Sequence, residues 1–141
     1  MIDLKFKVKQ NPIHIILFST IAIAFIILFF LEDSHSLLNT FMLGMTLYNI
    51  ISFFRSTYKF TSSSLIIHCG FVRTEILYED IRHIKYYGKP LHSEKWTRQR
   101  LEFAYGLFDT LTACVPQNEN EFLSELKSKC PNVKILDRHV N

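Results

Sequence analysis

Two long apolar segments, separated by a short polar break, constrain the fold of this chain more than any other feature. Residues 13–31 and 37–54 span 19 and 18 positions, and neither segment contains Asp, Glu, Lys or Arg. At ~1.5 Å of rise per residue each segment reaches ~27–29 Å as a helix, about the thickness of the hydrocarbon core of a bilayer. We therefore predict a transmembrane helical hairpin over residues 13–54.

The second segment carries polar side chains that need a partner inside a membrane. Asn39, Thr46 and Asn49 fall within an arc of about 80° on a helical wheel. Membrane helices use such groups to hydrogen-bond one another, so we predict a polar seam packed on the first helix. A transport site would need ionisable groups at mid-depth, and neither segment has one there.

The distribution of basic residues predicts the orientation of the hairpin. Lys5, Lys7 and Lys9 precede it and Arg55 and Lys59 follow it, whereas the break at 32–36 contains no Lys or Arg. The positive-inside rule therefore predicts a multi-pass protein of the cell membrane with both termini in the cytoplasm. Tyr58, just after the hairpin, is predicted to be an aromatic anchor at the headgroups.

The chain divides into four parts on this basis: a basic cytoplasmic N-terminus (1–12), the hairpin (13–54), a cytoplasmic domain (55–136) and a tail (137–141). From residue 55 the apolar residues alternate with polar ones, and turn signals separate six short runs. Gly70 stands where a turn needs a positive φ. The pattern predicts a bent antiparallel sheet or half-barrel of about six strands.

One helix is predicted after the strands, over residues 119–129. Asn118 is a favourable N-cap, and Glu121 completes the spacing of a capping box. An apolar stripe on this helix would cover the opening of the sheet, and residues 133–136 could form a last short strand. The predicted core, expected to fold without the anchor, consists of Tyr58, Phe60, Ile67, Ile76, Ile84, Leu101, Phe103, Leu111, Val115, Phe122 and Leu126.

Catalytic, metal and nucleic-acid sites find no support in the sequence. The three cysteines form no CxxC or CxH pair, and His68, His83 and His92 are scattered without a neighbouring nucleophile. The four glycines are isolated and form no phosphate-binding loop. A net charge of +3 is too small to indicate nucleic-acid binding. We predict that the protein is not an enzyme and uses no cofactor or metal.

Several short motifs in the order found here suggest a family. After the two apolar segments, the chain carries Tyr58-Lys59-Phe60, Leu65-Ile66-Ile67, Tyr78-Glu79-Asp80-Ile81, Arg100-Leu101-Glu102-Phe103, Tyr105-Gly106, Val115-Pro116, Glu121-Phe122-Leu123 with Leu126, and Pro131-Asn132-Val133. This pattern resembles the bacterial YyaB-like PH-domain family over residues 10–136. The resemblance implies a pleckstrin-homology-like (PH-like) fold behind a membrane anchor, and it implies no particular biochemical activity. The chain departs from the family at residues 92–98.

That departure lies within the most basic stretch of the chain. Residues 82–100 contain six Lys or Arg against one acid, Glu94, with the single tryptophan, Trp96, in the middle. A basic loop with an amphipathic aromatic suits contact with anionic headgroups. The candidate headgroup-binding or partner-binding residues are Lys89, Lys95, Trp96, Arg98 and Arg100. The alternative is a solvated charged loop in which Arg100 pairs with Glu79 or Glu102.

Two functions of different class are consistent with these features. The first is a membrane-anchored PH-like binding or scaffolding module at the cytoplasmic face, with the bilayer, anionic phospholipid headgroups or an unidentified protein or peptide as its partner. The second is a self-immunity protein against a membrane-active antimicrobial peptide. The sequence indicates neither the oligomeric state nor the physiological process.

Overall fold

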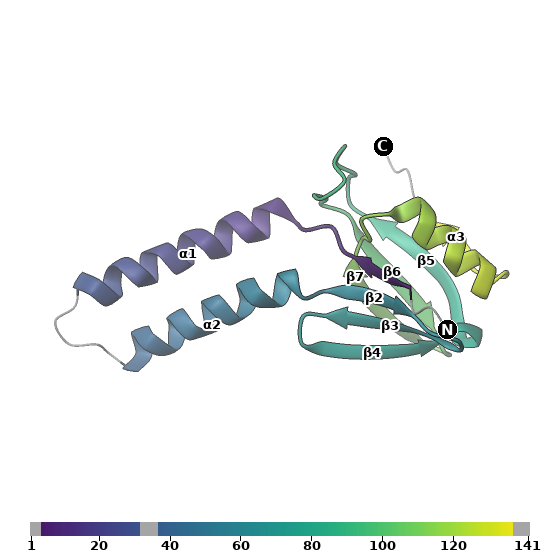
Figure 1. The fold of residues 1–141 in the computed structure, drawn as a ribbon, viewed down its shortest axis with the longest axis horizontal. Helices are drawn as coiled ribbons and strands as arrows, with labels where there is room; N and C mark the ends of the chain where they lie inside the picture. The colour runs from purple at the N-terminus through teal and green to yellow at the C-terminus, as the bar shows by residue number, and fades with distance from the viewer. Residues whose placement is uncertain (1–3, 32–36, 137–141) are drawn as a thin grey trace.

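The computed structural model describes residues 4–31 and 37–136, which fold into two long helices, two four-stranded sheets and one shorter helix near the C-terminal end (Figure 1). The polar break at 32–36 and the predicted tail at 137–141 lie outside the described residues.

The helices α1 (Pro12–Leu31) and α2 (Leu37–Phe54) run side by side and extend away from the sheets (Figure 1). Both are long and apolar enough to cross a membrane, with mean hydropathies of 2.7 and 1.4. Their surfaces are mostly exposed, and the residues they bury are Ala22, Asn39 and Thr46. Two members of the predicted polar seam are thus buried, whereas Asn49 is half-buried and donates to Met45 O of its own helix.

The first sheet consists of four antiparallel strands in the order β1-β2-β3-β4: β1 (Lys5–Lys7), β2 (Thr57–Phe60), β3 (Ser64–Cys69) and β4 (Val72–Leu77). A short 3₁₀ turn, η1 (Tyr78–Asp80), leads to the second sheet. Its order is β7-β6-β5-β8, with β5 (Ile81–Tyr87), β6 (Arg100–Tyr105), β7 (Asp109–Cys114) and β8 (Lys134–Leu136), and β8 is parallel to β5. The predicted β-rich domain with one helix is confirmed, and the described residues form eight strands in two sheets, where a bent sheet or half-barrel of about six strands and a last short one at 133–136 were predicted.

The extra strand at the start of the chain, β1, shows that residues 4–10 belong to the domain. Phe6 lies opposite Tyr58 of β2, and its ring packs edge-on, 5.6 Å between centroids, against Phe60 and against Phe122. Val8 is also buried. The prediction of a separate N-terminal segment over 1–12 is thus wrong for these residues. Helices α1 and α2 are inserted between two neighbouring strands of one sheet.

Helix α3 (Glu119–Lys129) packs on the core between the sheets, as its apolar stripe predicts. Phe122, Leu123 and Leu126 are buried, and the Phe122 ring lies 4.9 Å from the ring of Tyr58. Asn118 occupies the N-cap position, but its side chain makes no capping hydrogen bond to the backbone. Its amide instead donates to Glu121 Oε2 over 3.4 Å, so the predicted capping box is wrong.

Tyr58 belongs to the core, and the prediction that it anchors the domain at the headgroups is wrong. Its side chain is fully buried, and its hydroxyl donates to the carbonyl oxygen of Cys114 on β7. Burial also raises the pKa of its phenol well above the ordinary value. The alternation of Tyr58 and Phe60 with Lys59 favours this inward position, because both aromatic rings then face α3.

Candidate functional site

The turn between β3 and β4 packs against the last turns of α2. Gly70, at φ 66°, donates its backbone N–H to Ser56 Oγ over 3.0 Å. The ring of Phe71 stacks on Tyr48 with centroids 4.6 Å apart, and the Arg55 guanidinium lies 4.9 Å from the centroid of the same ring. These contacts hold the end of α2 against the first sheet.

The segment before α1 is tied to a loop of the second sheet. Gln10 donates its backbone N–H to Lys95 O and accepts from Thr97 N–H, both over 2.9 Å. Its side-chain amide donates to Phe53 O of α2 over 2.7 Å. One residue, Gln10, thus joins both helices to residues 89–99, the segment named here the Trp96 loop.

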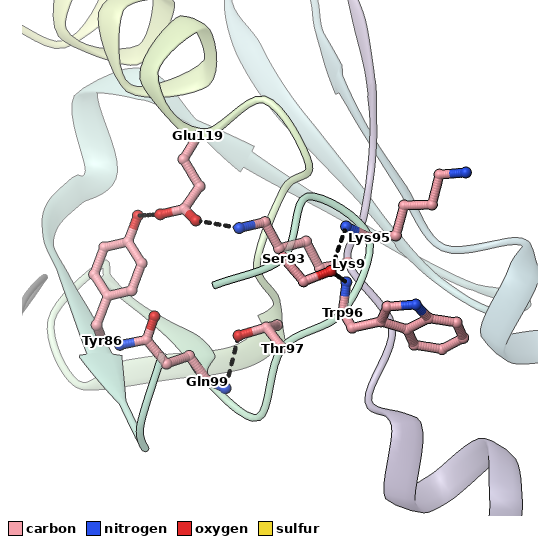
Figure 2. Close-up of polar contacts among 8 residues, drawn as sticks. All are labelled: Lys9, Tyr86, Ser93, Lys95, Trp96, Thr97, Gln99 and Glu119. Carbon is pink, nitrogen blue, oxygen red and sulfur yellow. Dashed lines mark hydrogen bonds and ion pairs between the residues drawn. The ribbon is translucent and has the colours of Figure 1, made fainter. Parts of the chain in front are cut away.

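The Trp96 loop has a defined conformation (Figure 2). The Ser93 hydroxyl accepts hydrogen bonds from the backbone N–H groups of Lys95, over 3.3 Å, and Trp96, over 3.2 Å. At the end of the loop, Thr97 and Gln99 are buried, and the Gln99 backbone N–H donates to Thr97 Oγ1 over 3.1 Å. Trp96 stays 39 % exposed. The loop therefore presents Lys95 and Trp96 on a folded support.

A strongly basic cleft of about 990 Å³ lies between the Trp96 loop, the outer face of the first sheet and the end of α2. Its charged residues are all cations, and none of the described residues that line it is Asp or Glu. Its walls include the side chains of Lys5, Lys7, Phe54, Arg55, Lys59, His68, Lys95 and Trp96. We call this space the basic cleft.

The register of β1 and β2 concentrates positive charge in the basic cleft. Lys5 pairs directly with Lys59 across the two strands, and Lys7 lies on the same face as Lys5 because side chains alternate along a strand. The register therefore places three lysines on the face of the sheet that lines the cleft.

A neighbouring lysine, Lys9, is neutralised inside the protein. Its ammonium lies 2.6 Å from Glu119 Oε1, and the two side chains are only 10 % and 20 % exposed. The other carboxylate oxygen of Glu119 accepts from the Tyr86 hydroxyl over 3.3 Å (Figure 2). Lys9 therefore holds the start of α3 and contributes no free charge to the cleft.

A model of the family described as "Bacterial PH domain" matches residues 56–130, more than half of the chain. The chain belongs to the bacterial PH domain family. No curated protein and no solved structure matches it. The matched range covers β2 to β7 and α3, while β1 and β8 lie outside it and complete the first and the second sheet. The narrower resemblance to YyaB-like proteins stays a prediction.

In the folded PH domain, the candidate residues predicted from sequence do not lie at one site. Lys95 and Trp96 line the basic cleft, whereas Lys89 and Arg98 are exposed and line no described cavity of the site. Arg100, at the start of β6, lines a second cavity. The sequence reasoning missed the cations that complete the cleft, which are Lys5, Lys7, Arg55 and Lys59. These residues flank the hairpin, and in the sequence they were used only to predict its orientation in the membrane.

The second cavity of the PH domain lies between the ends of both helices and the open corner of the two sheets, with a volume of about 380 Å³. We call it the junction cavity. Arg100 makes no ion pair there with Glu79 or Glu102 in the described part of the chain, so the predicted structural clamp is wrong. The walls of the cavity include His14, Phe18, Phe53, Cys69, Arg100, Thr112 and Cys114.

Two thiols of the PH domain, Cys69 and Cys114, face the junction cavity. Burial raises the pKa of both thiols, and the Arg100 guanidinium opposes the rise at Cys114. Both are free cysteines. Within residues 4–31 and 37–136, no group of three or more His, Cys, Asp or Glu side chains is placed to hold a metal ion.

Proposed function

We propose that this membrane-associated PH domain binds anionic lipid headgroups in its basic cleft at the cytoplasmic face of the cell membrane. The observation that carries the proposal is the composition of the cleft: five Lys or Arg side chains and no carboxylate among its described lining residues, at the end of an apolar helix. Phosphate is the chemical group that such a cluster suits best.

The position of the cleft supports this proposal. Phe54 and Arg55 mark the end of α2 and line the cleft, and Trp96 pairs with Gln10, two residues before α1 begins. If α1 and α2 span the bilayer, these residues lie at the depth of the headgroups. Tryptophan is enriched at that depth because its ring is apolar and its N–H is polar.

The strand pairing supports a hairpin whose two ends are on one side of the membrane. Strand β1 precedes α1, β2 follows α2, and the two strands are neighbours in one sheet. The positive-inside rule independently assigns that side to the cytoplasm, where anionic lipids give the leaflet a negative surface potential.

The affinity required of the cleft is small because the anchor already holds it at the surface. Each basic residue near an anionic leaflet contributes about 1 kcal/mol. The contribution decays within a Debye length of about 8 Å at physiological salt. We therefore expect headgroup contact to be sensitive to salt and to orient the domain.

The experiment uses Trp96 as an intrinsic probe, because the chain contains a single tryptophan. The full chain is reconstituted in nanodiscs of zwitterionic lipid, with or without an anionic phospholipid. We expect an emission shift to shorter wavelength and lower acrylamide quenching in the anionic discs at low salt. Lys7→Gln/Lys95→Gln should abolish most of the difference, whereas Lys127→Gln/Lys134→Gln, the same charge change outside the cleft, should retain it.

Identical Trp96 spectra in both kinds of nanodisc at low salt would exclude headgroup binding by the cleft. A protein or peptide partner would then be the remaining form of the binding-module hypothesis. The self-immunity function stays a prediction, since no feature of the described residues favours a peptide toxin as the ligand.

A further inference from the structure

The lining of the junction cavity combines an aromatic cluster from the helices with polar side chains from the domain. The helix wall is aromatic: Phe18 packs against Phe53 with centroids 5.5 Å apart, and His14 stacks on the same ring at 5.9 Å. The domain wall is polar and carries Arg100 at the start of β6, beside Thr112 and Cys114 of β7. The cavity is therefore amphipathic.

The cavity offers one cation, the Arg100 guanidinium, for binding a single phosphate group. Lys9 also lines it, but its ammonium is neutralised by Glu119 at 2.6 Å. Arg100 has no carboxylate partner among the described residues, and no Asp or Glu of the described chain lines the cavity. A guanidinium binds the oxygens of a phosphate through two parallel hydrogen bonds.

If α1 and α2 span the bilayer, the cavity lies at the level of the phosphate and the upper acyl chain of a lipid. His14 and Phe18 lie in the first two turns of α1, where a spanning helix passes from the headgroup layer into hydrocarbon. Arg100 belongs to the domain, at the start of β6, and lines the same cavity. A volume of about 380 Å³ is within the range of small-molecule sites.

We propose that the junction cavity holds one glycerophospholipid of the leaflet that faces the domain, with its phosphodiester on Arg100 and the upper part of an acyl chain against Phe18 and Phe53. This bound lipid is distinct from the headgroups at the basic cleft. Gln10, Ser56 and Gly70 line both spaces and form the partition between them. The inference goes beyond the proposed function, which concerns the basic cleft alone.

Three native thiols provide the test, because Cys69 and Cys114 line the cavity and Cys130 lies elsewhere, at the end of α3. The full chain in detergent micelles is titrated with phosphatidylglycerol, and maleimide modification of each cysteine is measured by peptide mass. We expect modification of Cys69 and Cys114 to slow about tenfold when the lipid exceeds its Kd about tenfold. Modification of Cys130 should not change.

Two analogues test separately whether the phosphate and the acyl chains are needed for binding. Diacylglycerol has the chains without the phosphate, and soluble glycerophosphate has the phosphate without the chains. We expect neither to protect Cys69 and Cys114 at the same concentration. Protection by diacylglycerol equal to that by phosphatidylglycerol would overturn the role of the phosphate, and equal protection by glycerophosphate would overturn the role of the acyl chain.

Arg100→Gln should remove most of the protection, whereas Arg98→Gln, an exposed neighbour outside the cavity, should leave it unchanged. The Trp96 emission shift should persist in Arg100→Gln, which separates this site from the basic cleft. If Arg100→Gln unfolds, a phospholipid with a photoreactive group near the top of one chain tests the same site in the unaltered protein. Labelling that omits the peptides containing Phe18 and Phe53 would contradict the proposal.

Discussion

The absence of a side chain at Gly70 sets how closely the β3–β4 turn approaches α2. A Cβ atom at this position would lie 1.8 Å from Ser52 Oγ, and the backbone has a φ of 66° that other residues adopt only with strain. The turn carries the hydrogen bond to Ser56 and the ring of Phe71 that hold α2. The close contact between α2 and the β3–β4 turn therefore depends on Gly70.

Gly70→Ala is expected to weaken that junction, with a backbone cost of about 1–3 kcal/mol before the clash with Ser52 is relieved. Thermal unfolding in detergent should begin at a lower temperature, and the cavity thiols should react faster with maleimide. Gly44→Ala is the control, because a Cβ there meets no atom within 4 Å. Equal melting curves for the two variants would show that the turn does not need to approach α2.

Single residues also show the limit of sequence reasoning about the site. The excess of positive charge in residues 82–100 predicted a basic surface around Trp96, and of the cations in this stretch Lys95 lines the basic cleft. It did not indicate that Lys5 and Lys59 face each other across two strands, because the register of β1 and β2 is a long-range property. Arg100 was assigned to the same surface, although β6 directs it to the other side of Gln10.

At the level of elements, local patterns predicted the strands β2 to β7 and α3 well, and β1 was missed. The alternation of Phe6 and Val8 with lysines was present in the sequence, but the lysines were interpreted only as a topology signal. Three residues of strand are also too short to stand out without their partner. The predicted core was consequently incomplete, and a fragment over 56–141 would expose the surfaces that Phe6 and Val8 cover.

The contribution of β1 can be measured by substitution in the full chain. Phe6 is buried against Phe60 and Phe122, so Phe6→Ala should lower the free energy of unfolding by about 3–5 kcal/mol. Lys5→Ala, on the exposed face of the same strand, should change it by less than about 0.5 kcal/mol. Urea unfolding followed by Trp96 fluorescence gives both values. Similar midpoints for the two variants would mean that β1 does not complete the sheet.

For the whole molecule, composition and periodicity predicted two apolar helices followed by a β-rich domain with one helix, and the family resemblance implied that this domain is PH-like; these features are confirmed. The division into two sheets was not predicted, because strand order depends on contacts between distant residues. The cavities were not predicted for the same reason. Each forms where the helix ends, the first sheet and the Trp96 loop meet.

The predicted orientation of the molecule can be tested with cysteines in a background where Cys69, Cys114 and Cys130 are replaced by Ala. Ser34→Cys lies between the apolar helices, and Ser128→Cys lies on α3. In intact cells, an impermeant thiol reagent should label position 34 from outside and position 128 only after lysis. External labelling at 128 would overturn the cytoplasmic assignment of the domain and the function proposed for it.

The insertion of α1 and α2 between β1 and β2 also has a consequence for biosynthesis. The ribosome completes β1 before it makes the helices, and β2 follows only after residues 8–56 have been synthesised. At ~5–20 residues per second, β1 waits about 3–10 s for its neighbour. If the helices span the bilayer, the translocon handles them during this interval. Closure of the first sheet occurs only after α1 and α2 have been made, so insertion of spanning helices would precede folding of the PH domain.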